Sequence, residues 1–415
     1  LKAMRRRRDR AVAVDADLVR RLSEAGSACE MVWREAKDKA DYAMVLPSLT
    51  QVRDLVAERA AALAAALGLD AYDALLDGFE PEARADKVVP VFDDLAAFLP
   101  GFTDDVLARQ AQAGAPLPLT GAFPIETQRK LCRNMMEVVG FDFTHGRLDE
   151  SHHPFCGGVP EDIRITTRYA EDDFMPGLMA VLHETGHALY EQGLPAERRH
   201  QPVGGAWGMA LHESQSLMIE MQACRSVEFI TFAAPLMREA FGSGGPAWEA
   251  ANIHRHYTHV ERAFIRVDAD EVTYPAHVIL RFRLERAMLA GALALKDLPG
   301  AWADGMGELL GLTPANDAEG CLQDIHWYDG AWGYFPTYTL GAMAAAQLFA
   351  AAVRARPGIP DGLAKGDFKP LMGWLRENVH ARGSLMPTDA LMEAATGAPL
   401  NATAFKAHLT TRYLA

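Results

Sequence analysis

Two histidines four residues apart constrain this chain more than any other feature of its sequence. The stretch Val181–Tyr190 reads VLHETGHALY and contains His183 and His187, with Glu184 directly after the first histidine. Residues four apart share one face of an α-helix, so both imidazoles can bind one metal ion while the glutamate points toward a water molecule beside it. This layout is typical of zinc peptidases, although so short a motif also arises by chance in ordinary amphipathic helices.

The residues around the motif predict a real helix. Asp172, Asp173 and Pro176 are acidic and proline start signals, and Gly193 followed by Pro195 marks the end. The body between them is apolar. Burying two imidazoles and a carboxylate in such a body is costly unless a partner is present, and a divalent cation is such a partner.

A catalytic zinc site needs a third protein ligand, and the extension that metzincins carry after this motif does not follow here. The next helical pattern, residues 207–220, contains Glu213 and Glu220. We expect Glu213 to be the third ligand because it belongs to the polar patch His212–Ser216, which a purely structural helix has little reason to hold. Glu220 is the next candidate, and a solvated helix face is the alternative reading of Glu213.

Composition excludes several classes of protein. A formal net charge of -14 argues against a nucleic-acid partner, and the basic run Arg5–Arg8 is better explained as a solvated helix face. No apolar run reaches the roughly 20 residues that cross a bilayer, so we expect no membrane partner. Five scattered cysteines predict reduced thiols and a cytoplasmic location.

The chain starts without methionine in helix-like sequence, and we expect an N-terminal helical segment to be missing.

Helical periodicity dominates the whole chain and predicts a mostly α fold. Apolar residues recur at three- and four-residue intervals in these ranges: 15–40, 47–68, 82–98, 102–113, 125–139, 172–192, 206–232, 246–260, 268–296, 299–311, 337–354, 369–380 and 388–396. The best strand is Ile163–Tyr169, and Phe141–Leu148 is its expected hairpin partner. Because no linker or repeat interrupts the pattern, we predict a single catalytic domain over residues 1–415, folded around a deep cleft with a small sheet edge near the metal.

Six motifs in one order resemble those of the carboxypeptidase Taq family of metallocarboxypeptidases. They are His153–Phe155 (HPF), Asp162–Thr166 (DIRIT), His183–His187 (HETGH), His212–Ser216 (HESQS), Ile265–Asp270 (IRVDAD) and Gly320–Trp327 (GCLQDIHW). The resemblance covers essentially the whole chain. It implies a helical fold related to neurolysin and angiotensin-converting enzyme, a homodimer, and release of single C-terminal amino acids from peptides with a free C-terminus.

One stretch departs from the family pattern. Leu217, Ile219 and Met221 stand where the family usually has Arg, Trp and Asn. The expected ligand Glu213 is intact, and we expect these departures to affect the residues behind the ligands and the dimer contacts.

The resemblance and the chemistry together assign roles around the metal. His183, His187 and Glu213 would hold zinc, although Co²⁺ and Mn²⁺ also fit such a site. Glu184 would act as general base and later as general acid. His277 matches the donor that stabilises the oxyanion in related helical zinc peptidases, and a core histidine is the equally weighted alternative. Tyr274, in the same segment, is an expected substrate contact.

Arg266 matches the family residue that binds the terminal carboxylate of the substrate. A guanidinium suits this role because it binds a carboxylate through a planar two-point fork. The alternative is an internal ion pair with Asp268 or Asp270.

Asp162 lies on the predicted strand, and an edge strand there could pair with the substrate backbone. A structural ion pair with Arg164 or Arg168 is at least as good an explanation of this residue.

The segment from Gln323 to Pro336 is too rich in aromatic residues and glycine for a regular helix, and we expect a loop that lines the cleft. Gln323, His326 and Tyr334 are its expected substrate contacts. Packing of Trp332 and Phe335 beneath the loop explains the same residues without a ligand.

Two other functions remain compatible with the motif. A zinc endopeptidase would share the metal site but lack the carboxylate anchor. A metal-binding scaffold without catalysis would be expected to have lost Glu184, and the chain retains it.

Overall fold

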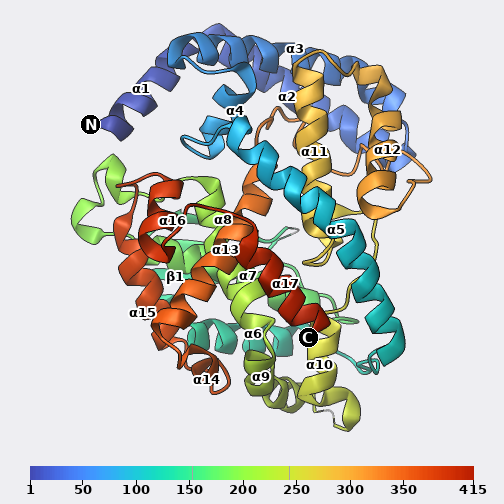
Figure 1. Cartoon of the computed structure of the whole chain (residues 1–415), viewed down its shortest axis with the longest axis vertical. Coiled ribbons are helices and arrows are strands. Elements are labelled where there is room, and N and C mark those ends of the chain that lie inside the picture. The colour runs from blue at the N-terminus through green and yellow to red at the C-terminus, as the bar shows by residue number, and fades with distance from the viewer. Residues whose placement is uncertain (152, 243) are drawn as a thin grey trace. The chain divides into compact units, whose positions relative to one another are not determined.

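The computed structural model describes residues 1–151, 153–242 and 244–415. These residues form two compact units, each built from two separate stretches of the chain (Figure 1). Unit 1 consists of Leu1–Leu107 and Val260–Thr339, and unit 2 consists of Ala108–His259 and Leu340–Ala415. In the described part of the chain, no helix is both long and apolar enough to span a bilayer.

Unit 1 is helical. It contains α1 (Lys2–Ala13), α2 (Ala16–Lys39), α3 (Tyr42–Leu67), α4 (Ala71–Phe79), most of α5 (Ala85–Ala113), α11 (Tyr274–Leu289) and α12 (Leu298–Leu310). The side chains of Asp15 and Asp41 accept the first free backbone N–H groups of α2 and α3, which fixes where both helices begin.

Unit 2 holds the sheet and the remaining helices. They are α6 (Ile125–Val139), β1 (Gly146–Glu150), β2 (Phe155–Val159), β3 (Asp162–Thr167), α7 (Met175–Gln192), α8 (Met209–Leu217), a π-helix (Met218–Cys224), α9 (Val227–Ala240), α10 (Ala250–Tyr257), α13 (Pro336–Ala355), α14 (Ile359–Leu363), α15 (Lys369–Asn378), α16 (Thr388–Thr396) and α17 (Thr403–Leu414). The predicted mostly helical fold with a small sheet is confirmed.

Helix boundaries differ from the predicted ranges where local geometry is unusual. The two helices expected at 82–98 and 102–113 are one helix, α5, which continues through Pro90 and Pro100. The range 206–232 is divided, because the α-helix becomes a π-helix at Met218 and α9 starts only after Ser226, whose side chain caps it. Helices α4, α14 and α17 were not predicted.

The sheet has the order β1-β3-β2, so β3 is its middle strand. Strand β3 confirms the predicted strand, but two expectations about it are wrong. Its hairpin partner is β2, because the two-residue turn at 160–161 joins them directly, whereas β1 runs parallel to β3. A parallel pair cannot be closed by a tight turn. Because β3 is bonded on both sides, it is not the edge strand that was expected to pair with a substrate.

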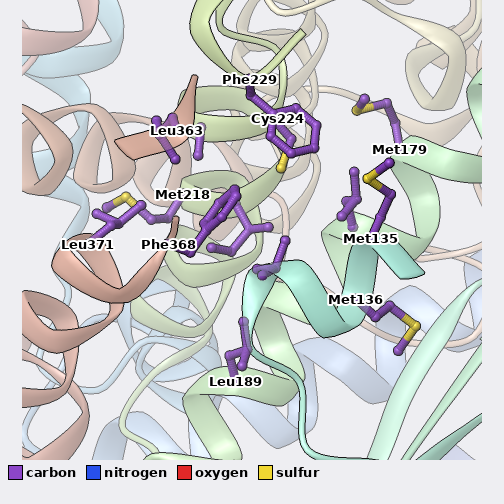
Figure 2. Close-up of a cluster of buried hydrophobic side chains, with 14 of the residues drawn as sticks. Met135, Met136, Met179, Leu189, Met218, Cys224, Phe229, Leu363, Phe368 and Leu371 are labelled. Atoms are coloured by element: carbon purple, nitrogen blue, oxygen red, sulfur yellow. The ribbon is translucent and has the colours of Figure 1, made fainter. Parts of the chain in front are cut away.

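Helix α7 lies in the apolar core of unit 2. Its start matches the sequence signals, since Asp173 accepts a hydrogen bond from the Met175 backbone N–H at 2.9 Å, and Gly193 follows its end. Figure 2 shows Met179 and Leu189 of this helix beside Met135 and Met136 of α6 and Met218 and Cys224 of the π-helix. Nearly every face of α7 is buried, and this packing fixes the orientation of the helix about its own axis.

A buried carboxylate fastens α1 to α4 in unit 1. Asp77 of α4 is 4% exposed and accepts hydrogen bonds from Arg6 and Arg10 of α1 at 3.0 Å each. The Glu82 backbone N–H and Arg84 bind its other oxygen at 2.8 and 3.4 Å. Burial by itself would raise the pKa of Asp77, but the Glu82 N–H and the guanidinium groups outweigh burial and hold the pKa below its usual value.

We expect Asp77→Asn to lower the free energy of unfolding at pH 7 by at least the roughly 1.5–3 kcal/mol of a hydrogen bond to a charged group. A depressed pKa stabilises the fold above the unfolded-state value of about 3.9, and this contribution is lost as the pH falls through the lower folded-state value. The difference between wild type and variant should therefore shrink below about pH 4 in urea unfolding curves.

Asp17→Asn is the matched control, because Asp17 pairs with Arg20 and Arg21 on the surface of unit 1 with its side chain 61% exposed. Its effect should be much smaller. Equal losses for the two variants, or an Asp77→Asn effect that persists unchanged at pH 3, would contradict this account.

Candidate metal centre

The two histidines of α7 present one nitrogen each to the same point. The rings of His183 and His187 lie one helical turn apart, with centroids separated by 5.0 Å. Glu213 of α8 reaches both, since its Oε2 is 3.8 Å from His183 Nε2 and 3.4 Å from His187 Nε2. The structure thus brings together the three predicted ligands.

This arrangement fits a divalent metal. Ligand atoms about 2.05 Å from a tetrahedral zinc ion are about 3.3 Å from one another, close to the two distances found here. Atoms of His183, His187 and Glu213 all lie within 4.8 Å of one another. Two imidazole nitrogens and one carboxylate oxygen are the donor set of open catalytic zinc sites.

The surrounding charge also favours a cation. The carboxyl groups of Glu184, Glu213 and Glu220 surround the imidazoles, and Arg225 supplies one positive charge beside Glu220. Burial by itself would lower the pKa of His183, yet the carboxylates of Glu213 and Glu220 raise it to about 10. A site this rich in carboxylates is stabilised by bound positive charge.

Two glycines allow the helices to approach closely enough for Glu213 to reach the histidines. A Cβ at Gly186, inside the histidine motif, would lie 2.4 Å from the backbone oxygen of Gln215 on α8. A Cβ at Gly341 of α13 would lie 2.7 Å from the Glu213 side chain. Any larger residue at these positions would displace α8 or the ligand itself.

Glu220 binds the opposite nitrogen of His183. Its Oε2 is 2.8 Å from His183 Nδ1, and its Oε1 accepts a hydrogen bond from Arg225 at 2.6 Å. Glu220 of the π-helix therefore binds Nδ1 of His183, while Glu213 of α8 faces Nε2 of the same ring. Such carboxylate partners fix the orientation and tautomer of a ligand histidine.

His187 is braced differently. Its Nδ1 lies 2.7 Å from Nδ1 of His212, and Nε2 of His212 lies 2.9 Å from Oε1 of Glu191. The consecutive residues His212 and Glu213 of α8 therefore face the two nitrogens of one imidazole.

Glu184 is held beside the two histidines at 8% exposure. Burial raises the pKa of its carboxyl to about 7, helped by the carboxylates of Glu213 and Glu220 and opposed by His183. A carboxyl with a pKa near neutrality can both accept and return a proton, which is the behaviour required of a general base that later acts as an acid.

Arg266 lies in a second buried cluster, in unit 1. Its Nε and Nη2 donate to Oδ1 of Asp324 at 3.0 and 2.7 Å, while Nε of Arg281 donates to Oδ2 at 2.6 Å. Burial by itself would raise the pKa of Asp324, but Arg281 and Arg266 hold it well below its usual range. The ion pair predicted with Asp268 or Asp270 is wrong, because Asp270 instead accepts backbone N–H groups at the start of α11.

Gln323 fills the remaining polar positions of this cluster. Its Oε1 accepts from the Arg266 backbone N–H and from Nη2 of Arg281 at 2.8 and 2.7 Å, and its Nε2 donates to the backbone oxygen of Phe264 at 3.0 Å. Both ends of the side chain are used inside the unit, so Gln323 fixes the two arginines.

The predicted aromatic loop follows this cluster and is irregular, as expected. Trp332 and Phe335 are buried beneath it, as the packing alternative required. His326 Nε2 lies 3.2 Å from the Tyr338 hydroxyl, and the ring of Tyr334 is 5.5 Å from that of His326. The packing explanation is confirmed, whereas the substrate contacts of the partly exposed His326 and Tyr334 rings stay predictions.

The surroundings of three further predicted site residues, His277, Tyr274 and Asp162, do not test their proposed roles. His277 of α11 is completely buried, and burial lowers its pKa to about 3, so the ring is neutral. Tyr274, at the start of α11, is 9% exposed. Asp162 is exposed and forms the ion pair with Arg164 that was its alternative explanation, with a shortest distance of 2.7 Å.

Comparison with known proteins identifies the family. The sequence profile described as carboxypeptidase Taq (M32) metallopeptidase matches residues 1–413. The chain belongs to the carboxypeptidase Taq family. Thermostable carboxypeptidase 1 of Thermus thermophilus is 40% identical over 98% of this chain and 81% of its own length, and carboxypeptidase 1 of Bacillus subtilis is 36% identical over 93% and 77%.

Solved structures agree with the sequence relatives. Trypanosoma cruzi metallocarboxypeptidase 1 superposes with a TM-score of 0.97 at 39% identity, over 100% of this chain and 83% of that one. The M32 carboxypeptidase from Deinococcus radiodurans gives a TM-score of 0.93 at 37% identity, over 99% and 82%. This carboxypeptidase Taq family member is thus a metallocarboxypeptidase, as the motifs predicted.

The departures from the family pattern leave the described support of the histidines in place. Leu217, Ile219 and Met221 are all buried, and Glu220 between them still binds His183. Sequence reasoning missed the partners behind the ligands. Glu191 could have been noticed, since it lies four residues after His187 on the same helix face.

The geometry makes a direct prediction about metal content. Glu213→Ala should lose the divalent ion that wild type is expected to bind at about one per chain, because it removes one of three ligands. Glu220→Ala should keep an ion, since Glu220 contacts only the outer nitrogen of His183. Elemental analysis of the purified variants measures both.

Glu197→Gln is the control for these variants, as Glu197 is an exposed residue of unit 2 with its side chain 69% exposed. If Glu213→Ala kept its metal ion and Glu220→Ala lost it, the third ligand would be Glu220 rather than Glu213.

Proposed function

We propose that this enzyme uses zinc held by His183, His187 and Glu213 to release single C-terminal amino acids from peptides with a free C-terminus. A divalent cation at such a site lowers the pKa of a water molecule and polarises a carbonyl group. Side chains of the protein bind the terminal carboxylate and transfer the proton. The cluster around Arg266 is the observation that carries the C-terminal specificity.

That cluster has an excess of positive charge. Arg266 and Arg281 share the single carboxylate of Asp324, and all three side chains are at most 10% exposed. A buried group of net charge +1 attracts an anion, because unbalanced charge is costly away from water. A peptide's terminal carboxylate is an anion of the right chemistry.

Arg266 also retains free donors. Both of its contacts with Asp324 use Nε and Nη2 on one oxygen, and within the described residues no partner is assigned to its Nη1. Tyr338 lies beneath the guanidinium, 4.8 Å from ring centroid to Cζ. A guanidinium held flat in this way can bind a carboxylate through its open edge.

Glu184 is proposed to move the proton of the reaction. It accepts a proton from the attacking water and later delivers that proton to the leaving amine. Its low exposure favours this role because few competing water molecules reach it.

The remaining predicted site residues have the following proposed roles. His326 and Tyr334 are proposed to contact the peptide from the aromatic loop, and Tyr274 from the start of α11. The assignment of His277 as donor to the oxyanion stays a prediction, and its complete burial favours the core alternative. Asp162 as a substrate contact also stays a prediction.

We further propose a cytoplasmic homodimer with a fold related to neurolysin and angiotensin-converting enzyme, on the basis of the motif resemblance. Zinc is proposed as the native metal, with Co²⁺ and Mn²⁺ as compatible alternatives. Light scattering of the purified enzyme tests the dimer.

Glu184→Gln tests the proton transfer. The amide keeps the size and polarity of the side chain but cannot accept the proton, so turnover should fall by roughly a hundredfold to ten-thousandfold while the metal content persists. Activity assays and elemental analysis of the same preparation measure both quantities. Unchanged turnover in the loaded variant would remove Glu184 from the mechanism.

Arg266→Ala tests the carboxylate anchor. It leaves Asp324 paired with Arg281, so no unbalanced buried charge results. Removing a charge-assisted hydrogen bond worth about 1.5–3 kcal/mol should lower kcat/KM for free-acid peptides about tenfold to a hundredfold or more. Amidated peptides should be cleaved poorly by wild type and be little affected by the substitution. Mass spectrometry of the peptide ladder measures both.

Arg283→Ala is the control, because Arg283 is a more exposed arginine of α11 that pairs with Asp93 and Glu308 on the surface. Internal cleavage by wild type, or equal losses on free-acid and amidated peptides, would show that Arg266 is structural and that the endopeptidase alternative holds.

A further inference from the structure

We propose that His212 and Glu191 form a hydrogen-bond relay that positions His187 for metal binding, in which Nδ1 of His212 accepts a hydrogen bond from Nδ1–H of His187. The proposal rests on the metal site proposed above and assigns a role to two residues outside the three ligands. Neither residue touches the proposed metal position, so both are positioning residues.

The relay joins two helices through three side chains. His187 and Glu191 are four residues apart on α7, and His212 of α8 bridges them. The ring of His212 also packs against His187 and Tyr190, with centroid distances of 4.7 and 5.3 Å. The bridging imidazole is therefore held by packing as well as by hydrogen bonds.

Only one proton arrangement satisfies every contact of a ligand His187. Its Nε2 faces Glu213 and must present a lone pair to a metal, so the proton of the neutral ring is on Nδ1. Nδ1 of His212 must then accept that proton's hydrogen bond. The remaining nitrogen of His212, Nε2, carries its own proton and donates to Glu191.

Glu191 completes the arrangement because it can only accept. A carboxylate at Nε2 holds the His212 proton on that nitrogen and leaves Nδ1 free as the acceptor. Without Glu191, His212 could adopt the other tautomer, and two Nδ1–H groups would then face each other across 2.7 Å.

The two ligand histidines thus have unlike supports. His183 donates directly to a carboxylate, Glu220, which Arg225 neutralises in part. In the proposed arrangement His187 donates to the imidazole of His212, and the carboxylate of Glu191 lies beyond it. Loss of a partner behind a ligand histidine typically lowers metal affinity about tenfold to a hundredfold.

Three substitutions of His212 separate the hydrogen bond from packing. In His212→Asn the amide oxygen occupies the topological position of Nδ1, so it can still accept from His187 although the link to Glu191 is lost. In His212→Gln the amide lies where Nε2 was and can reach Glu191 but not His187. His212→Leu fills the space and accepts nothing.

The experiment measures zinc affinity of the metal-free full-length chain by competition with a chelator, together with the visible spectrum of the Co²⁺ form. We expect His212→Leu and His212→Gln to bind zinc about tenfold to a hundredfold more weakly and to change the Co²⁺ spectrum. His212→Asn should bind within a few-fold of wild type. Glu191→Leu should weaken binding, whereas Glu191→Gln, which still accepts, should weaken it less.

His200→Leu is the matched control, since His200 is an exposed histidine of the same unit. Thermal unfolding of the metal-free proteins shows whether each variant is folded. Wild-type affinity and spectrum in His212→Leu would overturn the relay, as would equal weakening in His212→Asn and His212→Leu when both are folded.

Glu213→Ala in the same titration separates the two proposals. If Glu213→Ala retains zinc, the metal site itself is wrong. If Glu213→Ala loses zinc while His212→Leu binds normally, the site stands and only the relay is wrong.

Discussion

The close approach of α7 and α8 is the constraint on which the proposed chemistry depends. Gly186 lets the backbone of α8 lie directly against the histidine motif, and consecutive residues of α8 then face both nitrogens of His187. Both imidazoles, which would be costly to bury in an apolar helix, thereby gain a partner at Nδ1 and face the Glu213 carboxylate with Nε2. The surrounding methionine-rich core packs against both helices.

The two buried clusters, around His183 in unit 2 and around Arg266 in unit 1, have opposite charge imbalances. In unit 2, carboxylates outnumber the single guanidinium around the histidines. In unit 1, two guanidinium groups share one carboxylate. Each imbalance is unfavourable in isolation, and the proposed ligands, a metal cation in unit 2 and a peptide carboxylate in unit 1, carry the opposite charge. Unbalanced buried charges lower the stability of the fold, and the proposed function accounts for their presence.

The sequence predicted what short local patterns encode. The three proposed ligands and the limits of α7 follow from helical spacing and from start and stop residues, and the structure places them as expected. Contacts that depend on distant chain segments were missed. The alternative explanation of Arg266 was an ion pair with a near neighbour, Asp268 or Asp270, but its partner Asp324 lies 58 residues away. The pairing of Glu220 with Arg225 was hidden because a π-helix alters the spacing that an α-helix would give.

The side chains that meet around His183 and His187 come from one uninterrupted stretch of unit 2, from α7 through the π-helix. A cation shared by α7 and α8 acts there as a cross-link that closes only a short loop of chain. Such a cross-link restricts the unfolded chain little, so its stabilising effect depends on the concentration and affinity of the ion rather than on lost chain entropy. Because α7 is also held by the apolar core of unit 2, the proposed ion adds to a packing that the chain already provides.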